Sequence, residues 1–119
     1  MQHVTVLLVL PLPPVAFAIE WVGTVVGIAD GNTLSLLDAS HVRHRIRLDG
    51  IDAPERSQPF GQRARQSLAE LAQGRTARAA RAKTDHYGRA VCNVTVDGVD
   101  VGLEQVRRRG ALIASVNRS

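Results

Sequence analysis

Turn residues divide most of this chain into short apolar segments rich in β-branched side chains, and this pattern restricts it to folds built mainly from short strands. We expect strands at residues 21–28, 33–37, 41–48, 91–96 and 99–101, with turns at Asp30-Gly31 and at residues 38–40. The third strand carries two alternating sets of side chains, which are Val42, His44, Ile46 and Leu48 in one and Arg43, Arg45 and Arg47 in the other. A period of two puts the three arginines on one face of that strand.

One segment has the period of a helix instead. It follows Pro59, and Gly74 supplies its C-terminal stop. Its apolar positions recur at three and four residues, and they are Phe60, Ala64, Leu68, Leu71 and Ala72. Asp97-Gly98 predicts a tight hairpin, and residues 103–109 predict a last short helix that Gly110 ends. Many short strands with one crossing helix favour a mainly β (α+β) fold, a small closed or half-closed barrel rather than a parallel sheet.

Residues 1–18 differ in composition from the rest of the chain. They contain no Asp, Glu, Lys or Arg, and an apolar run from Val4 to Leu10 leads through three prolines to Ala16-Phe17-Ala18. This pattern predicts a secretory signal that leaves residues 19–119 as one domain, secreted or periplasmic. The alternative is a wrongly assigned start or an apolar tail. The run is too short and too rich in proline to cross a bilayer as a helix, so we expect no membrane association once the signal is removed. We also expect the protein to be a monomer.

The ionisable side chains narrow the class of protein further. A single cysteine, Cys92, excludes an intrachain disulfide, and its place in an alternating apolar run predicts a buried structural thiol. The formal net charge is +4, and all but one of the 15 basic residues are arginine. Arginine presents a planar, two-pronged set of donors to phosphate. The composition of a GC-rich genome accounts for most of these arginines, but Arg47 and Arg89 stand in more specific surroundings.

Four of the charged residues have the chemistry needed to cleave a phosphodiester. That reaction requires a base that prepares water, cations that hold the developing charge, and usually a metal that bridges oxygens. The run from Ile46 to Glu55 offers Arg47, Asp52 and Glu55, and the run from Thr84 to Arg89 adds a second arginine. Taken singly, each of these residues is explained as well by a solvated strand, a turn or an exposed helix start.

Three motifs in order carry a resemblance to a known family. They are D-G-N-T at residues 30–33, R-L-x-G-I-D-A-P-E at residues 47–55 and T-D-x-Y-G-R at residues 84–89. Together they resemble the thermonuclease, or staphylococcal-nuclease-like, family over residues 21–110. The resemblance implies a five-stranded OB-fold barrel with helices, which agrees with the order of elements expected above. It also implies a calcium-dependent nuclease that cleaves DNA and RNA.

The resemblance assigns a role to each matching residue. Glu55 would be the general base for water, while Arg47 and Arg89 would hold the phosphate and stabilise charge on its oxygens. Tyr87 and His86 would contact a neighbouring phosphate of the substrate. The 5′ oxygen would be the leaving group, so that the products would end in a 3′-phosphate.

The resemblance also implies a calcium site. Asp52 and the backbone carbonyl of Ala53 would be ligands, Asn32 would stand at the position of a further ligand, and Asp30 would order the surroundings of the metal. Hard cations such as calcium prefer oxygen ligands, which these residues supply. Where the family usually has D-G-D-T, however, Asn32 replaces a carboxylate with a neutral amide, so we expect weaker calcium binding.

Other positions also depart from the family. Ala77 and Ala79 stand where larger apolar residues are usual, which we expect to cost about 1–3 kcal/mol of core stability. Gly102 stands where an asparagine usually caps the last helix, and the C-terminal helical part is short. Three functions therefore remain open, in this order: a secreted calcium-dependent nuclease, a barrel that binds nucleic acid or protein without cleavage, and a poorly folding inactive remnant.

Overall fold

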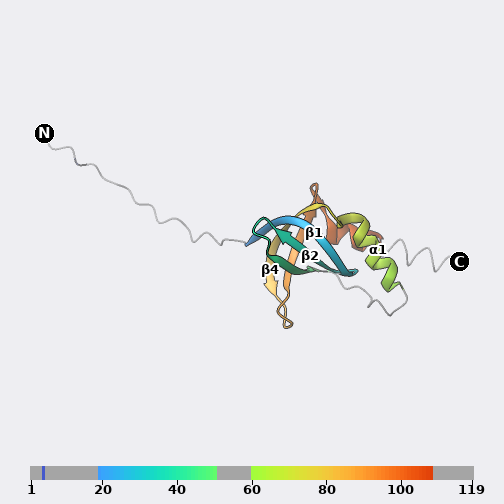
Figure 1. The fold of residues 1–119 in the computed structure, drawn as a ribbon. Helices are drawn as coiled ribbons and strands as arrows, with labels where there is room; N and C mark the ends of the chain where they lie inside the picture. The colour runs from blue at the N-terminus through green and yellow to red at the C-terminus, as the bar shows by residue number, and fades with distance from the viewer. Residues whose placement is uncertain (1–3, 5–18, 51–59, 109–119) are drawn as a thin grey trace.

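The fold was obtained as a computed structural model, which describes residues 4, 19–50 and 60–108 (Figure 1). The strands and the helix are β1 (Glu20–Asp30), β2 (Thr33–Asp38), β3 (Arg43–Leu48), α1 (Gly61–Ala72), β4 (Thr76–Thr84), β5 (Ala90–Val96) and β6 (Val99–Asp100). Residues 101–108 are also helical. The expected signal segment lies outside the described residues apart from Val4, as do residues 51–59 and 109–119.

The strands close into a barrel. Antiparallel pairing gives the order β3-β2-β1-β4-β5-β6, and a parallel pairing of β3 with β5 joins the two sides of the sheet. The closed circuit is therefore β1, β2, β3, β5 and β4, and the short β6 extends the β5 hairpin. In Figure 1, α1 and the helical segment 101–108 lie on the same side of this barrel. The five-stranded OB-fold barrel with helices is confirmed.

The core fills the inside of the barrel and the space beneath α1. Its fully buried members include Val25, Leu34, Ile46 and Leu68. Such burial stabilises the fold by about 25 cal/mol for each Å² of apolar surface removed from water. No helix within the described residues is both long enough and apolar enough to cross a membrane.

The two alanines that depart from the family lie in β4 and are buried, at 1% and 0% exposure for Ala77 and Ala79. Alanine has a low strand propensity, but β4 is paired along its length with β1 on one side and β5 on the other. Ala79 is the direct partner of Trp21, a large ring that packs against the core. The small side chain thus lies beside a large one.

Several ends of elements differ from the sequence prediction. The third strand begins at Arg43 rather than residue 41, because His41 has a left-handed backbone (φ 60°) and the Asp38 carboxylate accepts hydrogen bonds from the N–H groups of Ser40 and Val42. Val42, expected on the core face, is therefore 50% exposed.

The last helix begins at residue 101 rather than 103. Asp100 caps it, because its Oδ1 accepts a hydrogen bond from the N–H of Leu103 at 3.0 Å. The missing asparagine at Gly102 is therefore replaced by a cap two residues earlier. The tight hairpin at Asp97-Gly98 is confirmed, since both residues have positive φ (51° and 78°), as a type I′ turn requires. Gly74, with φ 74°, follows α1 as expected.

Candidate active site

The turn between β1 and β2 holds the first group of predicted site residues. Asp30 Oδ1 accepts a hydrogen bond from the backbone N–H of Asn32 at 3.0 Å, and the Thr33 hydroxyl donates to Asn32 Oδ1 at 3.1 Å. Asn32 is 8% exposed, and its backbone carbonyl accepts a hydrogen bond from the N–H of Leu48 at 2.8 Å. The turn is therefore fixed to the end of β3, from which the chain leads toward Asp52.

Strand pairing places Arg47 next to this turn. Thr33 of β2, Arg47 of β3 and Val91 of β5 are direct partners across three neighbouring strands. Ile46 and Leu48 belong to the core, so Arg47 between them points to the outer face of the barrel. Arg89 directly precedes β5 and, two residues before Val91, falls on the same alternate positions. The parallel β3–β5 pair thus brings the two predicted phosphate-binding arginines to one outer face.

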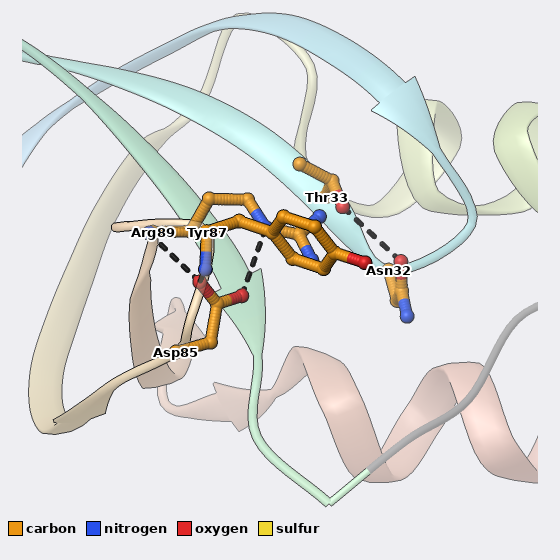
Figure 2. Close-up of polar contacts among 5 residues, drawn as sticks. All are labelled: Asn32, Thr33, Asp85, Tyr87 and Arg89. Carbon is orange, nitrogen blue, oxygen red and sulfur yellow. Dashed lines mark hydrogen bonds and ion pairs between the residues drawn. The ribbon is translucent and has the colours of Figure 1, made fainter.

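Asp85 organises the loop between β4 and β5. Its Oδ1 accepts hydrogen bonds from the backbone N–H groups of Tyr87 at 3.0 Å and Arg89 at 2.9 Å, and its Oδ2 lies 2.9 Å from Arg89 Nε. The side chains of Asp85 and Arg89 are 10% and 26% exposed. Figure 2 shows the carboxylate joined to both the loop backbone and the guanidinium. Because this contact uses Nε, the terminal nitrogens of Arg89 are the ones that would meet a phosphate.

The ionisation of Asp85 reflects these contacts. Desolvation raises the pKa of the Asp85 carboxyl, but the backbone N–H groups of Arg89 and Tyr87, together with the Arg89 guanidinium, outweigh it and hold the pKa below its ordinary value. Asp85 is therefore ionised near neutral pH and remains a charged partner for Arg89.

Tyr87 and His86 occupy the outer part of the same loop. Tyr87 is 73% exposed, and the Cζ of Arg89 lies 5.4 Å from the centre of its ring. The rings of His86 and Tyr87 are 4.0 Å apart. In Figure 2 the Tyr87 and Arg89 side chains extend from the loop in the direction of Asn32 and Thr33. An exposed ring and a flanking cation suit contact with a nucleic-acid chain.

The remaining predicted residues lie outside the described part of the chain. Asp52, Ala53 and Glu55 fall within residues 51–59, so their assigned roles stay predictions. Asp49, directly after β3, is still held beside β5, because its N–H donates to the carbonyl of Cys92 at 2.9 Å. The strand that ends there is the one that carries Arg47.

The described residues do not by themselves form the calcium site that the resemblance implies. Within them, no group of three His, Cys, Asp or Glu side chains gathers as a metal site would require. Asp30 and Asn32 nevertheless offer a carboxylate and an amide oxygen, the hard donors that calcium prefers. The donor chemistry therefore fits calcium. A complete set of six to eight oxygens would need further ligands, such as those expected at Asp52 and Ala53.

Two residues that the sequence interpretation gave no role also hold the site. Asp85 could have been recognised, since an aspartate three residues before a glycine is a common start of a turn. Gln105 has a weaker signal, as a polar residue in a short helix. It is 5% exposed, and its Nε2 donates to the carbonyls of Gly31 at 3.0 Å and Ala64 at 2.7 Å, while Ser67 donates to its Oε1 at 2.8 Å.

Cys92 is buried and takes no part in this site. Desolvation raises the pKa of its thiol to about 11, with a smaller contribution from Asp49 and an opposing one from Arg81. The thiol is therefore protonated at neutral pH. The predicted burial of this thiol is confirmed.

The sequence of this chain is similar to those of known proteins. The family model described as staphylococcal nuclease homologue matches residues 45–118. An uncharacterized endonuclease of Haemophilus influenzae is 38% identical over 84 residues, covering 71% of this chain and 47% of that protein. An uncharacterized endonuclease of Escherichia coli O157:H7 is 34% identical over 110 residues, covering 86% of this chain and 71% of that protein. The micrococcal nuclease of Shigella flexneri is 44% identical over 69 residues, covering 58% of this chain and 39% of that protein.

The chain spans about half the length of the Haemophilus influenzae relative and less of the Shigella flexneri relative. The family match includes Arg47, Arg89 and the helical segment 101–108, and therefore most of the barrel face described above. This match, the identities to the relatives and the closed five-stranded barrel agree. The chain belongs to the staphylococcal nuclease homologue family.

Proposed function

We propose that this protein is a nuclease that hydrolyses phosphodiester bonds of DNA and RNA. The observation that supports this most strongly is the shared outer face of β3 and β5, where Arg47 and Arg89 lie, with Arg89 oriented by Asp85. A fixed guanidinium can meet the phosphate oxygens without reorganising as their charge develops. The names of the relatives, two endonucleases and a micrococcal nuclease, support the same class of reaction.

In this proposal the chain's residues divide the work. Arg47 and Arg89 bind the two non-bridging oxygens of the phosphate, and Tyr87 and His86 contact the chain beside it. Glu55 takes a proton from water, which attacks phosphorus opposite the 5′ oxygen. The bond from phosphorus to the 5′ oxygen breaks, that oxygen takes up a proton from solvent water, and the phosphate stays on the 3′ side. Loss of one such charge-stabilising donor typically lowers a rate by about 10²- to 10³-fold.

We further propose that the activity depends on calcium. Asn32, Asp52 and the carbonyl of Ala53 would hold the ion, and Asp30 would order the turn around it. The ion would supply positive charge close to the phosphate oxygens. Asn32 brings no charge of its own, so the proposal includes a calcium requirement higher than that of a site with aspartate there.

The protein is also proposed to be exported, with residues 1–18 as its signal, and to act as a monomer outside the cytoplasm. Sequencing the N-terminus of the exported protein tests this part, and a chain that begins at Ile19 is expected.

Cleavage of a single-stranded DNA, with calcium and then with a chelator, tests the main proposal. Activity is expected only with calcium and only while Glu55 is intact, so Glu55→Gln should abolish it. Glu70→Gln is the matched control, because Glu70 is exposed on α1 and pairs with Arg108. Full activity in Glu55→Gln would contradict the assignment of Glu55 as the base, and full activity in chelator would contradict the proposed calcium requirement.

A second function, binding of nucleic acid without cleavage, is favoured by one observation. The Asn32 side-chain oxygen already accepts a hydrogen bond from the Thr33 hydroxyl and carries no charge. If the loss of charge prevents calcium binding altogether, the arginine face can still attract phosphate. Salt-sensitive binding without any hydrolysis at high calcium would support this function over the first.

A further inference from the structure

A pocket of about 360 Å³ opens beside Arg89, and within the described residues its lining does not include the β1–β2 turn that belongs to the nuclease motifs. Strands β1, β3 and β4 and the β4–β5 loop all contribute to it. The side chains that matter for its chemistry are Trp21, His44, Arg45, Arg81, Tyr87 and Arg89. Its volume is at the lower end of the ~300–1,000 Å³ typical of small-ligand sites, which suits a group the size of one nucleotide.

Two aromatic rings form one wall of this pocket. Trp21 and His44 are stacked, with centroids 4.0 Å apart and planes 16° from parallel. The His44 Nε2 lies 2.7 Å from Asp38 Oδ2, and Trp21 packs against the core beside Ala79. Both rings are therefore held in place before any ligand arrives, which lowers the entropy lost on binding.

The rest of the wall is positively charged. Arg45, Arg81 and Arg89 line it, and no carboxylate is among its lining residues within the described part of the chain. Arg89 and Tyr87 belong both to this pocket and to the candidate active site. A group bound in the pocket would therefore be a direct neighbour of the phosphate that Arg89 holds.

We propose that this pocket is a nucleotide subsite, in which a base of single-stranded nucleic acid packs against the Trp21–His44 pair while Arg45 and Arg81 attract its phosphate. Aromatic surface next to arginines is the combination by which proteins bind single strands. That the bound nucleotide lies next to the phosphate being cleaved rests on the proposed nuclease function. Binding of the base in the pocket does not depend on that function. A base within a duplex is stacked on both faces, so the subsite selects unpaired strands.

The intrinsic fluorescence of the protein reports on this pocket directly, because Trp21 is the only tryptophan. The wild-type chain is titrated, in chelator to prevent cleavage, with a short oligothymidylate and with an abasic strand of equal length and charge. Aromatic contact with a base predicts that the oligothymidylate binds about 5- to 150-fold more tightly and quenches Trp21. Equal affinity for the two strands would overturn the subsite, and this comparison needs no variant.

Two pairs of variants locate the binding within the pocket. His44→Ala should lower affinity for oligothymidylate but not for the abasic strand, whereas His41→Ala, at an exposed turn, should change neither. Arg45→Ala should weaken both strands more than Arg63→Ala, which removes the same charge from the exposed face of α1. Equal effects within each pair would contradict the assignment, and circular dichroism verifies that each variant folds.

A separate cleavage assay distinguishes the two proposals. Hydrolysis of oligothymidylate without any base-dependent quenching of Trp21 would overturn the subsite and leave the nuclease intact. Base-dependent quenching without hydrolysis would support the subsite and reject the nuclease. Absence of both would reject both.

Discussion

Replacing Gln105 with leucine tests whether the helical segment 101–108 holds the turn that carries Asp30 and Asn32. The Gln105 side chain makes three hydrogen bonds, to Gly31, Ala64 and Ser67, at 5% exposure. At about 0.5–1.5 kcal/mol for each bond, their loss costs about 1.5–4.5 kcal/mol. The added apolar contacts of leucine offset part of this, so we expect about 1.5–3 kcal/mol, a large share of the ~5–15 kcal/mol that stabilises a domain.

Urea unfolding measures this loss, and a lowering of Tm by at least about 6 °C should accompany it. Gln66→Leu is the matched control, since Gln66 is exposed on α1 and its replacement should change stability by less than about 0.5 kcal/mol. Because Gly31 lies between Asp30 and Asn32, Gln105→Leu should also raise the calcium concentration needed for half-maximal cleavage. Equal unfolding midpoints in the two variants would refute the stabilising bridge, and an unchanged calcium requirement would refute its link to the turn.

Three further predictions concern charge and ionisation. Asn32→Asp should lower the calcium concentration for half-maximal cleavage, because it restores a charged oxygen ligand, and a calcium titration of both proteins measures this; an unchanged midpoint would place any weakness elsewhere. The pKa of Asp85 is lower in the folded state than in the unfolded state, where it is about 3.8. The ionised carboxylate therefore contributes its full stabilisation at pH values above the unfolded pKa, and this contribution is lost as pH falls through the folded pKa. Urea midpoints measured between pH 7 and pH 3 should therefore fall less steeply in Asp85→Asn than in the wild type, and parallel curves would count against this linkage. The Cys92 thiol, with a pKa of about 11, should react with a thiol reagent at pH 8 only after unfolding in urea, and rapid reaction of the native protein would show that it is accessible and ionised.

Elements with a clear local signal were predictable from the sequence. The alternation at residues 41–48 indicated the strand that the structure places at β3, the three- and four-residue spacing indicated α1, and Asp97-Gly98 indicated the hairpin. Each of these depends on neighbours in sequence, through periodicity or a turn conformation. Their combination was enough to predict a barrel.

Features that depend on distant residues were harder to predict. The start of β3 moved because the Asp38 carboxylate organises the preceding turn, and the last helix began earlier because Asp100 caps it. The stacking of Trp21 on His44 joins residues of β1 and β3, which are not directly paired strands. No local pattern contains that contact, because it joins two strands that lie on either side of β2.

The candidate site was also predictable only in part. The motifs identified Arg47 and Arg89, and the β3–β5 pairing places both on one face. The motifs also contained Asp85, but its role became visible only when its oxygens met the backbone of Tyr87 and the Arg89 guanidinium. Gln105 lies 74 positions from the carbonyl of Gly31 that it holds, so sequence spacing alone did not connect them.

The most direct test of the central claim is the calcium-dependent rate at which Arg89→Lys cleaves single-stranded DNA. Lysine keeps the charge but lacks the planar guanidinium that Asp85 contacts through Nε and that would meet phosphate in the proposed site. The rate should fall by about 10²- to 10³-fold, while Arg63→Lys, on the exposed face of α1, should cleave at the wild-type rate. A wild-type rate in a folded Arg89→Lys variant would contradict the assignment of Arg89 as a phosphate clamp, and with it the proposed active site.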